Sequence, residues 1–410
     1  MRKKDAISTI LGLQGFFVYD HRLEGSEAVH LELRRMVRHY RCPKCGQLHL
    51  VPFDEHPVTV QDLPMSGRRV YLHFRKARVL CCRGQPQTEH LSWVAKNAQQ
   101  TLRLRWAIYQ ECRHDTVKVV AERHGLSWDT VKSIDLEILQ AQISRQKLQG
   151  VRRIAVDEIA RARRHKYLTV VTDLDRGKVI WVKGGRKSKS FKEFFKARSS
   201  AGGSGVQVVA MDMWRPFIQA VQGEAPGARI VFNKFHVVQH LLKALDEVRR
   251  QEARRLEKQS GKELFRKRWV LLKNPENLKP EQQGTLSELL AENRALHSAY
   301  LLKEDFRSFY QMDFGWHRHR RQWNRIRQLA AQRLDGWIRR ARESALGAFE
   351  RFCKLLDKHR DGVLAYFIDP VSTALSEAMN SKINALKTRA RGYRDLDYFI
   401  LKIYQQCGLI

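Results

Sequence analysis

The order of apolar runs after Gly150 constrains the fold more than any other feature of this 410-residue chain. A short β-type run at 153–158 is followed by two more, 167–174 and 178–183, which flank an Asp-Arg-Gly turn signal. Helix and strand patterns then alternate until a long amphipathic helix, expected over 236–256. This order predicts three antiparallel strands followed by parallel strands with helical connections.

The alternating part predicts which acidic residues meet. We expect a helix over 188–197, a strand over 206–211 that ends at Asp212, a helix over 216–221 and a strand over 229–232. Three antiparallel strands followed by this alternation is the order of a ribonuclease-H-like α/β core, in which the first and fourth strands lie side by side. Asp157, which ends the first run, would then lie beside Asp212 although 55 residues separate them.

A third carboxylate lies on the last part of the chain. A helix is expected to start at Asp369-Pro370, with Leu375, Met379, Ile383 and Leu386 on its apolar side and Glu377 and Asn380 on its polar side. Two Mg²⁺ ions about 3.5 to 4 Å apart, held by carboxylates, stabilise the attacking and leaving oxygens in phosphodiester cleavage. We therefore predict that Asp157, Asp212 and Glu377 bind two Mg²⁺ or Mn²⁺ ions, although a single Asp after a strand is more often a turn or cap residue.

The charge of the chain indicates the type of partner. Lys and Arg number 76 against 43 Asp and Glu, which gives a formal net charge of +33, so the partner should be a polyanion. Because 43% of residues are hydrophobic, the chain is expected to fold rather than to form a disordered basic tail. No apolar run reaches the roughly 18 to 20 residues of a membrane span, and the stretch 7–18 is interpreted as a strand rather than a signal peptide.

The N-terminal region, 1–95, has short β-type runs at 29–37, 58–60 and 69–79 and four of the seven cysteines. Cys42-Pro-Lys-Cys45-Gly has the spacing of one corner of a zinc ribbon. The second corner is irregular, and its candidate ligands are Cys81, Cys82 and His90. We predict a structural Zn²⁺ site and a reducing cytoplasm; the alternative is a set of ordinary buried thiols.

Region 96–150 has helical periodicity and contains a candidate helix-turn-helix over 117–134. Gly125 would form the turn and Ser127 would cap the second helix. Ser127, Trp128 and Lys132 are the candidate DNA contacts. A purely structural helical hairpin has the same spacing and remains the alternative.

Region 257–360 lacks β signals and is predicted to be an all-helical insertion that separates the core, 151–256, from its last part, 361–410. Trp316, Trp323 and Trp337 share one helical face, which is typical of a core rather than a stacking platform. The candidate phosphate contacts are Arg318, Arg320, Arg321, Arg325, Lys382, Lys387 and Arg389.

Several motifs together resemble a known family. They are Ala155-Val-Asp157-Glu158, Val209-Ala-Met-Asp212, Phe235-His236-Val-Val and Glu377-x2-Asn380-x2-Ile383, together with the Cys42 to Gly46 corner. Across essentially the whole chain, the sequence is similar to bacterial insertion-sequence transposases of the ISL-three family with an Asp-Asp-Glu catalytic core. The resemblance implies that Asp157, Asp212 and Glu377 form the metal-binding triad and that His236 and Asn380 support it.

The resemblance also implies a function. The expected enzyme binds the terminal inverted repeats of its element, frees a 3′-hydroxyl by hydrolysis, and joins it to double-stranded target DNA. Synapsis of two ends implies at least a dimer, in a bacterial cytoplasm and associated with the nucleoid. The alternatives are a non-catalytic DNA-binding regulator and a ribonuclease-H-like nuclease of DNA repair.

Overall fold

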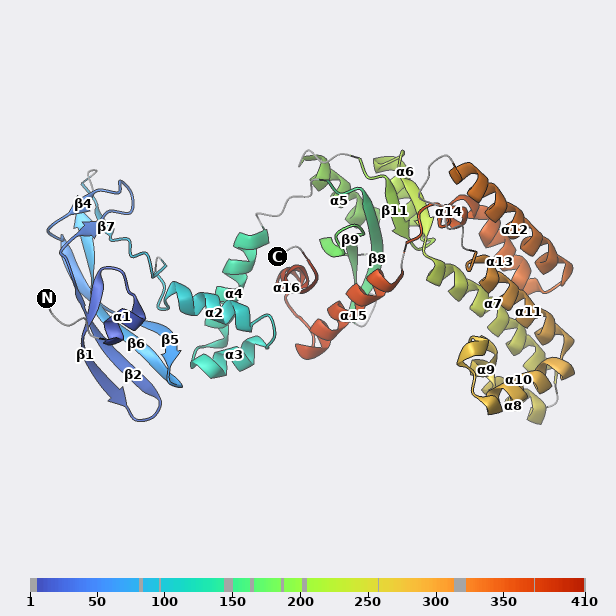
Figure 1. Cartoon of the computed structure of the whole chain (residues 1–410), viewed down its shortest axis with the longest axis horizontal. Coiled ribbons are helices and arrows are strands. Elements are labelled where there is room, and N and C mark those ends of the chain that lie inside the picture. Colours follow the sequence, from blue (N-terminus) through green and yellow to red (C-terminus); the bar gives the residue numbers. More distant parts are fainter. Residues whose placement is uncertain are drawn as a thin grey trace. The chain divides into compact units, whose positions relative to one another are not determined.

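The computed structural model divides the chain into two compact units, Met1–Arg145 (unit 1) and Gln146–Ile410 (unit 2) (Figure 1). It describes residues 6–80, 84–95, 97–143, 150–162, 166–185, 188–200, 205–256, 258–312, 322–371 and 373–408. Among these described residues, no helix has both the length and the apolar content that a bilayer crossing requires.

Unit 1 begins with a five-stranded sheet whose main order is β1-β2-β6-β5, with β7 paired to β6. The strands are β1 (Phe16–Glu24), β2 (Ala28–Arg35), β5 (Asp54–Met65), β6 (Arg68–Leu80) and β7 (Pro86–Thr88), while β3 (Tyr40–Arg41) and β4 (Leu48–His49) form a separate ribbon. The predicted strands near 29–37, 58–60 and 69–79 are confirmed, and Ser66 and Gly67 turn the β5–β6 hairpin with φ angles of 50° and 76°.

The strand predicted over 7–18 is wrong in its first half. Ala6–Leu11 forms the short helix α1, and β1 starts only at Phe16. Gly12 and Gly15, with φ angles of 59° and 84°, separate the two elements. The helix turns Leu11 onto the core of the sheet, where it packs among the buried residues of β1, β2 and β6, so tertiary packing decides the conformation of this segment.

Three helices complete unit 1, namely α2 (Leu102–Glu111), α3 (Val117–His124) and α4 (Trp128–Ile143). Gly125 ends α3 in a left-handed conformation, with φ 63°, and the Ser127 hydroxyl accepts a hydrogen bond from the Thr130 N–H at 3.1 Å. The predicted helix, turn and helix are therefore confirmed. The Gln61 side chain on β5 donates to the His124 carbonyl at 2.8 Å, so these helices pack against the sheet within one unit.

Unit 2 contains a five-stranded mixed sheet of order β10-β9-β8-β11-β12. Its strands are β8 (Arg153–Ala162), β9 (Lys166–Asp173), β10 (Lys178–Gly184), β11 (Val208–Met211) and β12 (Arg229–Phe232), with the helices α5 (Ser188–Ser200), α6 (Arg215–Glu224) and α7 (Lys234–Arg255) between or after them. The first three strands are antiparallel, and β11 runs parallel to β8 and β12. The predicted adjacency of the first and fourth strands is confirmed.

The position of Asp157 within its strand differs from the prediction. We expected a short run that ends at the carboxylates, but β8 continues to Ala162 because β9 remains paired with it on the other side. Only the parallel pairing with β11 is short, and its last pair is Ala155 with Ala210. Asp157 therefore lies in mid-strand, just beyond the end of that pairing.

All elements that the structure describes between α7 and the end of the chain are helical. They are α8 (Lys258–Arg266), α9 (Arg268–Leu272), the 3₁₀ turn η1 (Pro275–Asn277), α10 (Pro280–Glu292), α11 (Arg294–Phe309), α12 (Trp323–Glu343), α13 (Gly347–Lys358), α14 (Arg360–Ala365), α15 (Thr373–Arg389) and α16 (Leu396–Cys407). One continuous hydrophobic core extends from the sheet into helices α8 to α14.

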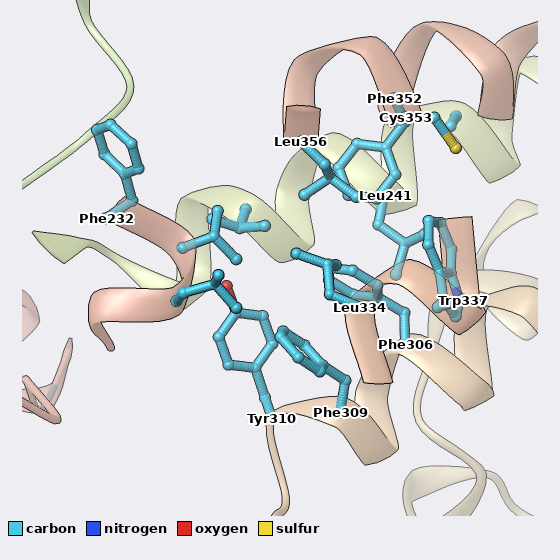
Figure 2. Close-up of a cluster of buried hydrophobic side chains, with 14 of the residues drawn as sticks. Phe232, Leu241, Phe306, Phe309, Tyr310, Leu334, Trp337, Phe352, Cys353 and Leu356 are labelled. Atoms are coloured by element: carbon cyan, nitrogen blue, oxygen red, sulfur yellow. The ribbon is translucent and has the colours of Figure 1, made fainter. Parts of the chain in front are cut away.

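Aromatic side chains form the centre of this helical core (Figure 2). Trp337 is 1% exposed, donates its indole N–H to the Leu302 carbonyl at 2.9 Å, and lies 4.7 Å from the ring of Phe306. The prediction that the tryptophans are core residues is confirmed for Trp337, whereas Trp323 is half-buried and Trp316 lies outside the described residues.

Two leucines on α12 test this core directly. Leu334 is fully buried, so Leu334→Ala should lower the free energy of unfolding by about 2 to 5 kcal/mol because it removes apolar contacts and leaves a cavity. Leu329 on the same helix is 40% exposed, and Leu329→Ala should change it by less than about 0.5 kcal/mol. Urea unfolding followed by circular dichroism compares the two, and equal losses would contradict this assignment of the core.

Candidate functional site

The parallel register of β8 and β11 brings two aspartates together. Arg153, Ile154 and Ala155 pair with Val208, Val209 and Ala210, so each residue of β8 faces the one 55 positions later. Continued by two residues, the same register sets Asp157 opposite Asp212. Side chains at matched positions of neighbouring strands point to the same face, and both aspartates line one small cavity.

Hydrogen bonds fix the orientation of both carboxylates. Asp157 accepts the Glu158 backbone N–H at 2.8 Å with one oxygen and the Asn380 side-chain amide at 2.7 Å with the other. Asp212 accepts the Met213 N–H at 2.6 Å, and its second oxygen lies 4.0 Å from His236 Nδ1. The side chain of Asp212 remains 45% exposed, so it is accessible to a ligand outside the cavity.

Helix α15 supplies the contact to Asp157 from the far end of the chain. Met379, Ile383 and Leu386 are buried, as the sequence predicted, and this packing presents Asn380 to β8. The helix begins at Thr373 rather than at the expected Asp369-Pro370, and Asp369 instead forms an ion pair with Arg229 at the start of β12.

Glu377 lies one helical turn before Asn380 on α15 and is exposed. Its neighbour Ser376, which the sequence analysis did not single out, lines the cavity with Asp157 and Asp212, whereas Glu377 does not. The structure therefore brings two of the three predicted carboxylates together and leaves the third on the helix that contacts Asp157, outside the cavity.

Two further histidines lie near Asp212. Burial lowers the pKa of His240 and of His359, a nearby lysine acts on each in the same direction, and the charge of Asp212 opposes both. Both rings are therefore predominantly neutral at pH 7. Sequence reasoning missed them, although His240 follows His236 by four residues and so shares its face of α7.

The side chains at this site fit a hard cation in their donor type. Two carboxylates converge with an amide and a hydroxyl nearby, and Mg²⁺ prefers such oxygen ligands. Within the described ranges, no three His, Cys, Asp or Glu side chains stand close enough to form a complete metal site. The cavity holds only about 10 Å³, roughly one water, so a large substrate must bind at its exposed edge beside Asp212.

The first predicted zinc corner has the backbone geometry that thiolate ligands need. The Cys42 N–H donates to the Gln47 carbonyl at 2.9 Å and the Gly46 N–H donates to the Cys42 carbonyl at 3.0 Å, which closes a tight loop with Gly46 at φ 72°. Both Cys42 and Cys45 lie in this loop, so one turn carries the two sulfur atoms of the predicted corner. Cys42 is buried and Cys45 is exposed.

The second zinc corner is only partly described. The His90 N–H donates to the Arg41 carbonyl at 3.2 Å, so the backbone of His90 lies beside the first corner, and the residue is exposed. Cys81 and Cys82 lie outside the described residues. His90 therefore remains a candidate third ligand by position.

The second helix of the helix-turn-helix, α4, carries the predicted DNA contacts at its start. Trp128 is 48% exposed, and the Lys132 ammonium lies 5.3 Å from the centre of its ring. Ser127 caps the helix with its hydroxyl, so that side chain also has a structural role. An exposed aromatic ring beside a cation at a helix start is a suitable surface for DNA.

The basic residues of unit 2 fall into different environments. Arg325, Lys382 and Arg389 are exposed, whereas Arg318, Arg320 and Arg321 lie outside the described residues. The Lys387 ammonium donates to the Ala160 carbonyl of β8 at 2.9 Å, so it holds α15 against the sheet.

Several arginines of α12 pair with acidic residues of neighbouring helices. Arg333 and Arg340 bind Asp305 at 3.0 and 2.6 Å, and Arg342 binds Asp357 at 2.6 Å. Part of the positive charge of this segment therefore stabilises helix packing, and only the remainder is available to a polyanion.

Three family models match consecutive parts of the chain. One described as "Transposase" matches residues 154–403, one described as "Helix-turn-helix domain of transposase family ISL3" matches residues 89–139, and one described as "zinc-finger of transposase IS204/IS1001/IS1096/IS1165" matches residues 38–83. The first contains the sheet and the carboxylates of unit 2, and it covers more than half of the chain.

Curated relatives agree over nearly the full length. The chain is 30% identical over 412 residues to the transposase for insertion sequence element IS1001 of Bordetella parapertussis, an alignment that covers 98% of each protein. It is 27% identical over 380 residues to the transposase for IS1557 of Mycobacterium tuberculosis, covering 86% of this chain and 82% of the relative. These matches define a DNA-processing enzyme of the transposase class. The chain belongs to the ISL3 family of insertion-sequence transposases, with a zinc ribbon, a DNA-binding helix-turn-helix and an Asp-Asp-Glu transposase domain.

Zinc content tests the corner at Cys42. Cys42→Ser should lose bound zinc, since a hydroxyl is a poor replacement for a thiolate ligand, and metal analysis of the purified protein measures this loss. Cys353→Ser is the matched control, because burial raises the pKa of Cys353 to about 11 and keeps it a neutral thiol in unit 2. Equal zinc content in both variants would contradict the site.

Proposed function

We propose that this transposase binds the terminal inverted repeats of its element, cleaves a DNA strand at each end by metal-dependent hydrolysis, and joins the freed 3′-hydroxyl to target DNA. The observation that carries the proposal is the pair Asp157 and Asp212, set opposite each other by the β8–β11 register and oriented by backbone N–H groups. This arrangement concentrates negative charge at one edge of a sheet in a chain of net charge +33.

In this proposal, unit 2 is a ribonuclease-H-like core interrupted by an all-helical insertion, and Glu377 is the third carboxylate. The exposed position of Glu377, one turn from Asn380, supports this role because Asn380 on the same helix already contacts Asp157. Asn380 is a positioning residue: its amide donates to Asp157 and holds that carboxylate in one orientation.

The carboxylates Asp157, Asp212 and Glu377 would hold two Mg²⁺ or Mn²⁺ ions, which supply Lewis acidity and align the attacking oxygen with the phosphorus. The histidines near Asp212 also support binding of a hard cation. His240 and His359 are close enough to Asp212 for mutual electrostatic effects, and burial lowers the pKa of both rings, so these two histidines add little positive charge beside the carboxylate.

DNA recognition would be divided between the two units. Trp128 and Lys132 at the start of α4 would contact the DNA ends of the element. Ser127 would stabilise the start of this helix through its hydroxyl cap. Lys382 and Arg389, on the helix that carries Glu377, would contact phosphates near the carboxylates, and Arg325 on α12 would contact phosphates elsewhere on unit 2. Arg318, Arg320 and Arg321 remain proposed contacts on sequence grounds. Two ends must be brought together, so we also propose at least a dimer on DNA.

Alanine substitutions test the triad. Asp157→Ala, Asp212→Ala and Glu377→Ala should each abolish strand cleavage and strand transfer on labelled element ends with Mg²⁺ or Mn²⁺, because each removes a metal ligand. Affinity for the ends should remain, since the helix-turn-helix is in the other unit.

The control for this experiment is Asp361→Ala, which removes an exposed carboxylate whose ion-pair partner is Arg327. It should retain full activity. Cleavage by the triad variants at wild-type rates would refute the metal site and favour a non-catalytic DNA-binding regulator. Equal cleavage of unrelated DNA by the wild-type protein would favour a repair nuclease.

The recognition helix gives a separate test. Lys132→Ala should weaken binding to the element ends and reduce the slope of log affinity against log salt by about 1, because one phosphate contact and its released counterion are lost. Arg22→Ala on the exposed part of β1 is the charge-matched control and should leave the slope unchanged. Binding measured by fluorescence anisotropy at several salt concentrations checks this, and the same slope for both variants would assign Lys132 to packing on Trp128.

A further inference from the structure

A second and larger cavity lies at the opposite edge of the unit 2 sheet from the carboxylates. Its volume is about 930 Å³, and its lining includes the first residues of β8, β11 and β12, which are Arg153, Val208 and Arg229. The last turns of α5 and α6 close its side. Asp212 follows the other end of β11, so the two sites are separated by the length of the strand.

Arginine dominates the charge of this cavity. Four arginines line it, namely Arg152, Arg153, Arg198 and Arg229, against two carboxylates, Glu224 and Asp369. Both carboxylates are engaged, because Asp369 pairs with Arg229 and Glu224 lies 3.7 Å from Lys192. The guanidinium of Arg152 is exposed and forms no ion pair with any residue that the structure describes.

Arg198 is the most informative of the four. It is 3% exposed, and one of its terminal nitrogens donates to the Val151 carbonyl at 2.6 Å. Its Nε has no hydrogen-bond partner among the described residues. Burial lowers the pKa of Arg198, and no described carboxylate acts in the opposite direction. A buried charge of this kind is destabilising unless a counterion compensates it.

The position of Arg198 at a helix end does not by itself compensate the cost of burying its charge. Arg198 lies in the last turn of α5, where a cation interacts favourably with the negative end of the helix dipole. That interaction is weaker than the penalty of burying the charge. An anion in the cavity would supply both the missing charge and the missing acceptor.

The opposite wall is preorganised for a planar contact. The Arg229 guanidinium carbon lies 4.8 Å from the centre of the Trp323 ring, and Asp369 holds the same guanidinium through an ion pair. Arginine held in this way presents its remaining N–H groups in a fixed fork that matches phosphate geometry.

From these contacts we propose that the cavity at the amino ends of β8, β11 and β12 binds a phosphate group of a nucleotide, either free or within a DNA strand. Arg152 provides the exposed approach, Arg198 the buried charge and Arg229 the fixed fork. The proposal does not depend on the catalytic role of Asp157, Asp212 or Glu377.

Titration of the full-length protein with inorganic pyrophosphate, without added divalent metal, tests this site. Arg152→Glu should weaken pyrophosphate binding by roughly tenfold to hundredfold, the loss expected when a hydrogen bond to a charged group is removed. Arg266→Glu, an equally exposed change on α8, is the matched control and should bind as the wild type does. Arg198→Lys keeps the charge but removes the Nε–H donor that has no partner among the described residues, and it should weaken binding less than Arg152→Glu.

The source of the phosphate is resolved by repeating the titration with adenosine monophosphate and with a duplex of unrelated sequence. A loss in Arg152→Glu confined to the duplex assigns the site to a DNA backbone, and a loss confined to the mononucleotide assigns it to a free nucleotide. The proposal is overturned if the wild type does not bind pyrophosphate, or if Arg152→Glu and Arg266→Glu bind it equally. It is also overturned if Arg198→Lys changes only the urea midpoint.

Discussion

The parallel pairing of β8 with β11 is the constraint on which the rest of unit 2 depends. It sets a constant offset of 55 residues between the two strands, and this offset places Asp157 beside Asp212. The pairing requires a crossover through β9, β10 and α5 on one side, and it leaves β11 free to pair with β12 on the other. The carboxylate pair is thus a product of strand register.

Much of this arrangement was predictable from the sequence. The apolar runs of β9 to β12 and of α7 have clear periodicity and flanking turn residues, so their positions and order followed directly. The helix-turn-helix was equally clear because Gly125 and Ser127 act locally, through a left-handed φ angle and a hydroxyl cap. The features that could be predicted reliably were therefore those that residues close together in the sequence determine.

Features determined by distant contacts were not predictable. Residues 7–11 have a β-like composition but form α1, because Leu11 gains burial on the sheet. The length of β8 depends on β9, and Asp369, which the sequence placed at a helix start, instead pairs with Arg229, 140 residues away. The sequence also gave no sign that Arg333, Arg340 and Arg342 pair with acidic residues of other helices.

The hydrogen bonds of α15 and α16 to the sheet have a consequence for synthesis of the protein. Asn380 and Lys387 contact Asp157 and Ala160 across more than 220 residues, and the Tyr404 hydroxyl accepts the backbone N–H of Val182. A nascent or truncated chain that ends before α15 lacks these contacts. Asp157 acquires the hydrogen bond from Asn380 only after α15 has been translated, so the order of translation itself delays completion of the site.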